Sequence, residues 1–180
     1  MKTPIRITLA SLLWLALAAL LPAQAPAAAP GFHKAGAKAF KASVPREFYL
    51  EGNAIPVERY HTALLLEGRK QFIVGLLATS GYSSDVRQKY LGMMIAETPV
   101  SLNGVRLEVG SYGFGLAPVN DAGKRATVLR IYNQAGAQVG KCTAHKDLKL
   151  RHPMPLEVLV EKGGARVRIY FGRYWVTLHG

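Results

Sequence analysis

The sequence contains few residues whose types and spacing could support catalysis or metal binding. The most suggestive pair is Cys142 and His145, a thiol and an imidazole three residues apart. Side chains alternate between the two faces of a strand, so this spacing places the two groups on opposite faces, where they cannot hold one ion. A tetrahedral metal site also needs further ligands, and the nearest are Asp147 and His152. These residues indicate no metal, no cofactor and no catalytic group.

A cluster near the C-terminal end has the character of a binding surface. Three of its residues, Arg166, Arg168 and Tyr170, share the outward face of a predicted strand over 166–171. Aromatic rings beside guanidinium groups suit stacking on sugar rings, or contact with an anionic polymer. The alternative is an ordinary solvated sheet face, because Glu157 and Glu161 partly neutralise the arginines. The cluster consists of Arg166, Arg168, Tyr170, Arg173, Tyr174 and Trp175.

A second candidate surface comes from an alternation of bulky and minimal side chains. Ser111, Gly113 and Gly115 alternate with three bulky apolar residues in the predicted strand 109–117. The bulky residues anchor a core, while the other face is nearly bare backbone. Such a face lets another element pack very close, or it lets a ligand approach the backbone. Close packing is the commoner reason for glycine in a strand.

Short strands must position these groups. After about Glu47 the sequence alternates apolar and polar residues, with turn signals at intervals of about eight to twelve residues. We predict an all-β fold: a single antiparallel β-sandwich, or a partly open barrel, of about 8–9 strands. The segment 83–95 is ambiguous. Ser84 and Asp85 favour a short helix, but so short a helix needs packing to survive, and we predict a strand from about Lys89.

Three turns set the expected strand registers. They are Gly68-Arg69, Asn103-Gly104 and Gly163-Gly164. The Gly-Gly pair suits a type I′ turn, in which both central positions need positive φ. The hairpin at Gly68 is apolar on both faces, so it should lie centrally, covered on both sides. The expected cross-strand pairs are His61 with Leu76, Leu65 with Phe72, Leu102 with Val105, Val158 with Ile169 and Val160 with Val167.

The N-terminal residues have the features of a Sec-type signal peptide. Lys2 and Arg6 precede an uncharged run over 7–21, and 25–27 offers a small-x-small cleavage site. The run is too short to span a hydrocarbon core of about 30 Å comfortably, so we predict cleavage and no integral membrane span in the mature protein. The predicted organisation is a signal peptide over 1–27, a flexible basic arm over 28–46 and a β-sandwich domain over 47–180. The expected location is the periplasm or the outside of a bacterial cell.

The charge balance is strongly basic. The formal net charge of +12 falls to +10 without Lys2 and Arg6, and to +6 without the four cations of the arm. Such an excess favours anionic partners, such as an anionic glycan or lipid headgroups, while nucleic acid is not the expected partner. Solubility alone is the plainer explanation.

The run from Val100 to Phe114, with Gly110-Ser111-Tyr112 inside it, resembles a segment of uncharacterised exported bacterial proteins. In that family a Gly-x-Tyr motif leads into a central strand of a small β-sandwich. The segments 151–156 and 170–176 resemble further parts of the same family, and the likeness extends over 97–178. The sequence departs from the family pattern at Val109, where Ala or Pro is expected. The resemblance implies a β-sandwich and carries no activity.

We therefore expect an exported, non-enzymatic β-sandwich that binds a ligand or partner in the envelope or outside the cell. An anionic ligand or partner is one of the options. The outward face of the C-terminal hairpin and the basic arm are the expected contact surfaces. One alternative is a hydrolase or metal-dependent enzyme whose site the sequence does not reveal. Another is a structural envelope-assembly protein, in which the glycine-rich face or an edge strand accepts a strand of an envelope protein.

Overall fold

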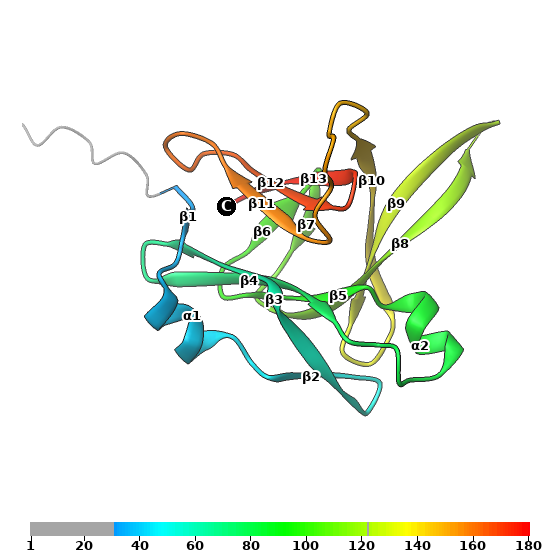
Figure 1. Ribbon diagram of the computed structural model, residues 1–180, viewed down its shortest axis with the longest axis horizontal. Coiled ribbons are helices and arrows are strands. Elements are labelled where there is room, and N and C mark those ends of the chain that lie inside the picture. The colour runs from blue at the N-terminus through cyan, green and yellow to red at the C-terminus, as the bar shows by residue number, and fades with distance from the viewer. Residues whose placement is uncertain (1–30, 122) are drawn as a thin grey trace, which may run out of the picture.

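The computed structural model describes residues 31–121 and 123–180, so the predicted signal peptide over 1–27 lies outside the described residues. Strands joined by short turns dominate them (Figure 1), and the prediction of an all-β antiparallel fold is confirmed. The elements are β1 (His33–Lys34), α1 (Ala37–Ser43), β2 (Glu47–Leu50), β3 (Asn53–Glu67), β4 (Lys70–Leu77), α2 (Ser84–Lys89), β5 (Gly92–Ala96), β6 (Val100–Leu102), β7 (Val105–Leu107), β8 (Gly110–Asp121), β9 (Lys124–Asn133), β10 (Gln138–Lys146), β11 (Glu157–Val160), β12 (Val167–Phe171) and β13 (Tyr174–His179).

The strands form a sheet that nearly closes on itself. Its order is β1-β3-β4-β5-β8-β9-β10-β13-β12-β11, while β2 pairs with β3, and the β6–β7 hairpin joins β13 through β6. In Figure 1, β11, β12 and β13 lie above β3 and β4, whereas α1 and β2 lie below them. The two ends of the sheet meet at the N-terminal side of β1. There the N–H of Phe32 donates to the carbonyl oxygen of Gly164 at 3.0 Å.

The expected hairpin registers are confirmed. Val160 lies opposite Val167, Leu102 opposite Val105, and Leu65 opposite Phe72. Both residues of the Gly-Gly turn have positive φ, +86° and +72°. Among the described residues the sheet has 13 strands instead of about 8–9, and the additional ones include β1 and β2, which pair with β3 over only two and four residues. So short a strand leaves little alternation in a sequence to detect.

One expected pair is wrong: His61 does not lie opposite Leu76. The register of β3 shifts between Glu58 and Thr62, and Leu76 instead pairs with Glu58. The bulged residues make their own contacts. His61 Nδ1 lies 2.9 Å from a carboxylate oxygen of Glu58, and the Thr62 hydroxyl donates to the Glu58 carbonyl at 2.9 Å. Residues 59–61 have no partner on β4, so this bulge changes the register of all residues beyond it.

Buried side chains form an inner core and an outer core. The inner core fills the nearly closed sheet and includes the fully buried Phe72, Phe114 and Ile169. The outer core lies between the other face of β3, β4 and β5 and a layer made of α1, the β2–β3 hairpin and α2. Leu64 and Ile73 face this outer core, so the β3–β4 hairpin is covered on both faces, as predicted.

Residues 31–46 belong to the folded domain, which corrects the expectation of a flexible arm over 28–46. β1 pairs with β3, and α1 follows it. Phe32 is 3% exposed and Val44 is 4% exposed. The guanidinium of Arg59 lies over the Phe40 ring at 5.2 Å and donates to the Val44 carbonyl. A few apolar residues thus anchor a segment whose lysines and alanines indicate flexibility.

The ambiguous segment contains both a helix and a strand. α2 ends at Lys89 and β5 begins at Gly92, so the expectation of a strand from Lys89 is wrong. The short helix survives because it is capped and packed. Ser83 Oγ accepts from the N–H of Val86 at 3.4 Å, and Val86 and Tyr90 insert into the outer core. Neither helix in the described part of the chain has the length and apolar composition needed to cross a bilayer.

Candidate functional site

The outward side chains of β10, β13, β12 and β11, together with the segment 147–155, form one surface that we call the C-terminal face. These strands are neighbours in the sheet. The register places Trp175 opposite both His145 on β10 and Tyr170 on β12. The structure therefore brings the predicted residues of β12 and β13 together with His145. From the sequence, His145 is a candidate only for metal binding.

Trp175 has a neighbour on each side, because β13 runs between β10 and β12. Its ring centroid lies 4.5 Å from that of His145. On the other side, Cζ of Arg168 lies 4.9 Å from the indole centroid. Arg168 also pairs with Glu161, with 3.3 Å between Nη2 and Oε1, while its Nε is buried without a hydrogen-bond partner. The indole therefore orders the arginine by a cation–π contact.

The other aromatic residues of the cluster are also covered. Tyr170 is only 5% exposed, and its hydroxyl lies 3.4 Å from a carboxylate oxygen of Asp147. Tyr174 packs partly against the inner core. Of the six predicted residues, only Arg166 is exposed, and the other five are buried or half-buried. The flat aromatic platform expected for stacking on sugar rings is thus not what the structure presents; the rings hold the basic groups in place.

The segment 147–155 is a structured loop that presents apolar and basic side chains. Asp147 Oδ1 accepts from the N–H groups of Lys149 and Leu150 at 2.9 and 3.2 Å. Arg173 donates to the Leu150 carbonyl, which ties the loop to the β12–β13 turn. Leu148 is 77% exposed at the tip, and Lys149 and Arg151 are exposed beside it. This loop is not among the sites predicted from the sequence, although its alternation of leucines with basic residues is a visible signal.

The glycine-rich face of β8 is covered by α2. A Cβ at Gly113 would lie 2.7 Å from a ring carbon of Tyr90, and a Cβ at Gly115 would overlap the carbonyl oxygen of Lys89. Ser111, the third residue of this face, is half-buried at the end of β8. Of the two possibilities for this face, close packing is the one present at Gly113 and Gly115. Hollows nevertheless border Gly115 on both sides of α2.

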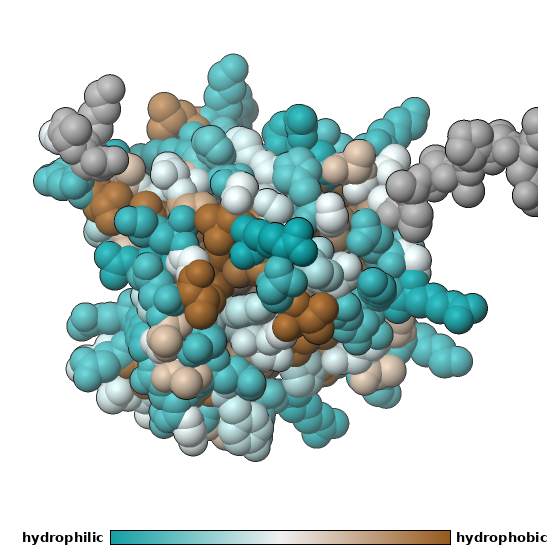
Figure 2. Space-filling model, turned by 180° about the vertical axis from the view of Figure 1, so that it is seen from behind, coloured by the Kyte–Doolittle hydropathy of each residue, from teal (hydrophilic) through white to brown (hydrophobic). Residues whose placement is uncertain are grey.

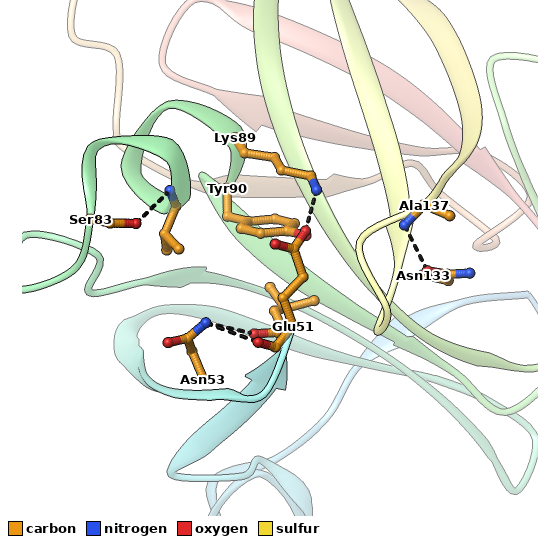
Figure 3. A network of polar contacts seen from close by, with 9 residues as sticks. Glu51, Asn53, Ser83, Lys89, Tyr90, Asn133 and Ala137 are labelled. Atoms are coloured by element: carbon orange, nitrogen blue, oxygen red, sulfur yellow. Dashed lines mark hydrogen bonds and ion pairs between the residues drawn. The ribbon is translucent and has the colours of Figure 1, made fainter.

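A polar network holds α2 in this position (Figure 3). The hydroxyl of Tyr90 donates to Glu51 Oε1 at 2.7 Å, and Lys89 forms an ion pair with the same oxygen. The Lys89 ammonium lies 5.2 Å from the Tyr90 ring centroid and 5.0 Å from that of Tyr132. The sequence did not reveal this network, because it joins a turn near residue 51 to a helix near residue 89.

Glu51 occupies an unusual backbone conformation. Its φ is 49°, and with Gly52 at 77° it forms the β2–β3 turn. Left-handed backbone is costly for a glutamate, and Asn103-Gly104 shows the usual residue types for such a turn. The hydrogen bond to Lys89, followed by that to Tyr90, lowers the pKa of Glu51. Burial, followed by the bond to Glu51, raises the pKa of Tyr90.

Replacing Glu51 with glutamine should lower the free energy of unfolding at neutral pH by about 0.5–1 kcal/mol, because it removes a partly exposed ion pair but keeps an acceptor for Tyr90. A carboxylate with a lowered pKa stabilises the fold above its unfolded-state pKa, near 4.5, and loses that effect as the pH falls through its folded-state value. Urea unfolding between neutral and acidic pH should therefore show the two proteins converging below about pH 4.5. A difference that does not change with pH would contradict the ion pair.

Cys142 and His145 are separated by the sheet, as predicted. Cys142 is buried in the inner core, and burial raises the pKa of its thiol to about 11. His145 is exposed on the C-terminal face. In residues 31–121 and 123–180, no group of three or more His, Cys, Asp or Glu side chains has an arrangement that could hold a metal ion.

The chain matches no protein-family model, no curated protein and no solved structure. Its resemblance to exported bacterial β-sandwich proteins therefore stays a prediction. Function has to be argued from the surface itself, and the C-terminal face is the part of it where charge, aromatic residues and an exposed apolar side chain meet.

Proposed function

We propose that this protein is a non-enzymatic binding protein that attaches peripherally to an anionic lipid surface through its C-terminal face. The observation that carries the proposal is the loop 147–155. It presents Leu148, which is 77% exposed, beside Lys149 and near Arg151, in a segment fixed by hydrogen bonds to Asp147. An apolar side chain among cations suits the boundary between acyl chains and anionic headgroups.

The charge of the C-terminal face supports an anionic partner. Residues 145–175 include seven Lys or Arg residues and three Asp or Glu residues. Of these cations, Arg168 is the one found in an ion pair among the described residues. Each Lys or Arg near an anionic membrane contributes about 1 kcal/mol of attraction. Several unneutralised cations together can therefore give measurable binding.

A lipid surface fits the face better than a glycan does. Recognition of sugars uses exposed ring faces, whereas Trp175 has neighbours on both sides and Tyr170 is buried. Attachment should be peripheral. The side of the molecule in Figure 2 shows hydrophobic residues only as small patches broken by hydrophilic ones. Binding then depends on charge and on single apolar side chains. Export, which would bring the protein to an envelope membrane, is part of this proposal.

Vesicle co-sedimentation tests the proposal. The protein should bind vesicles of phosphatidylglycerol and phosphatidylcholine in equal parts, bind pure phosphatidylcholine weakly, and lose binding as salt is added. Leu148→Ser should weaken binding about tenfold, because transfer of a leucine side chain is worth about 1.5–3 kcal/mol. The pair Lys149→Gln and Arg151→Gln should weaken it about 30-fold, at about 1 kcal/mol for each charge.

Two matched variants on other surfaces serve as controls. Val109→Ser removes another exposed apolar side chain, and Arg69→Gln with Lys70→Gln removes the same charge from the β3–β4 turn. Both controls should bind vesicles nearly as well as the unmodified protein. If the controls lost as much vesicle binding as the loop variants, binding would depend on the net charge of the protein and not on the C-terminal face. If the protein bound an acidic polysaccharide but not the vesicles, the ligand of the C-terminal face would be a glycan and the lipid proposal would be wrong.

A further inference from the structure

A hollow beside α2 has the composition of an anion site. It has a volume of about 360 Å³ and lies between the helix and the β8–β9 ladder. Gly115 and Ala117 form its floor, so no large side chain fills it. Gln88, Tyr132 and Arg130 also line it, and Arg130 is the lining residue whose guanidinium carries a charge that no ion pair among the described residues neutralises. A guanidinium beside a hollow floored by small residues can bind the oxygen atoms of an anion.

Arg130 is placed where its charge lacks a counterpart. Its cross-strand neighbour on β10 is Lys141, and its neighbour on β8 is Gly115. Like charges directly opposite each other destabilise a sheet. Among the residues that the structure describes, neither Arg130 nor Lys141 takes part in an ion pair. An anion in the hollow would relieve this repulsion, and the guanidinium fork suits two oxygen atoms of one group.

The other charged residues around the hollow determine which anions it can bind. Lys89 borders it, but Glu51 neutralises that ammonium. Asp85 also borders it and opposes an anion. Arg130 borders the hollow as well and carries the charge that attracts an anion. The hollow therefore favours a small group with concentrated negative charge that can reach Arg130 without approaching Asp85.

We propose that this hollow binds a phosphate group, held mainly by Arg130. The site goes beyond attachment to lipid through the C-terminal face, because none of its side chains belongs to the loop 147–155. The phosphate comes either from a headgroup or from free phosphate in solution. These two sources share one chemistry, and titration with each of them distinguishes them.

The test is a titration of the isotope-labelled protein with inorganic phosphate at constant ionic strength, followed by backbone amide NMR. The Gly115 and Arg130 amide signals should shift and saturate, while chloride at the same ionic strength should give no saturable shift. Arg130→Gln should weaken binding about tenfold or more, because a hydrogen bond to a charged group is worth about 1.5–3 kcal/mol. Asp85→Asn should strengthen it by about twofold to fivefold. Arg130→Lys should restore part of the affinity.

Glycerol 3-phosphate in a second titration identifies the source. Tighter binding than inorganic phosphate indicates a headgroup, and equal or weaker binding indicates free phosphate. Arg166→Gln on the C-terminal face is the matched control and should leave the titration unchanged. Leu148→Ser should weaken vesicle binding but leave the phosphate titration unchanged, so either proposal can fail alone. Shifts that never saturate, or that survive Arg130→Gln unchanged, would overturn the phosphate site.

Discussion

Gly115→Ala should lower the free energy of unfolding by about 1–3 kcal/mol, the usual cost of overpacking. A Cβ at this position would overlap the carbonyl oxygen of Lys89 at the end of α2. The obstacle is backbone, which cannot change rotamer to make room. Either β8 distorts or α2 lifts from the sheet and loses the Glu51 contacts. Urea unfolding with amide NMR of α2 measures both consequences.

Gly81→Ala is the control for this substitution. No atom lies within 4 Å of the Cβ position of Gly81, and its φ is not in the left-handed range. Its unfolding free energy should stay within about 0.5 kcal/mol of that of the unmodified protein. If Gly115→Ala were equally harmless, the helix would not lie against β8 in solution, and the hollow beside it would not have the shape described.

Gly164→Ala should be more damaging, at about 2–5 kcal/mol, because two costs add. The residue has φ +72°, where any Cβ is strained, and this Cβ would also lie 2.6 Å from the backbone nitrogen of Phe32. The contact is the one that brings the two ends of the sheet together. Its loss should release β1 from β3 as well as destabilise the whole fold. Thermal unfolding and hydrogen exchange at Phe32 measure the two effects.

A substitution at the neighbouring Gly163 distinguishes the cost of backbone strain from the cost of the steric overlap. Gly163 has φ +86° but nothing within 4 Å of its Cβ position, so Gly163→Ala carries only the left-handed strain of about 1–2 kcal/mol. The difference between the two variants is the cost of disturbing the contact with the N-terminal segment. Equal losses in both variants would mean that the segment 31–34 does not close the sheet.

Local patterns were enough to predict much of the fold. The turns at Asn103-Gly104 and Gly163-Gly164 set their registers because tight turns leave one pairing that buries the apolar face. The bulge at Glu58 was not predictable in the same way. It depends on contacts of His61 and Thr62 with Glu58, and period-two alternation contains no information on inserted residues.

The candidate sites were less predictable, because they join residues far apart in the chain. The outward placement of Arg166 and Arg168 followed from alternation, but the burial of Tyr170 depends on the loop at Asp147. The meeting of His145 with Trp175 requires knowing that β10 pairs with β13, and no hairpin turn connects those strands. Phe32 and Val44 give no periodic signal, so the composition of their segment predicts a flexible arm.

The most direct test of attachment through the C-terminal face is a nitroxide label at position 148, introduced by Leu148→Cys and studied by electron paramagnetic resonance with anionic vesicles. Cys142 should not compete for the label, because it is buried and its thiol pKa is raised to about 11. A second label at Tyr49, 58% exposed on β2, reports on another surface. We expect the label at 148 to become shielded from water-soluble relaxation agents when vesicles are added, while the label at 49 stays accessible. Equal accessibility of both labels on bound protein would contradict attachment through the C-terminal face.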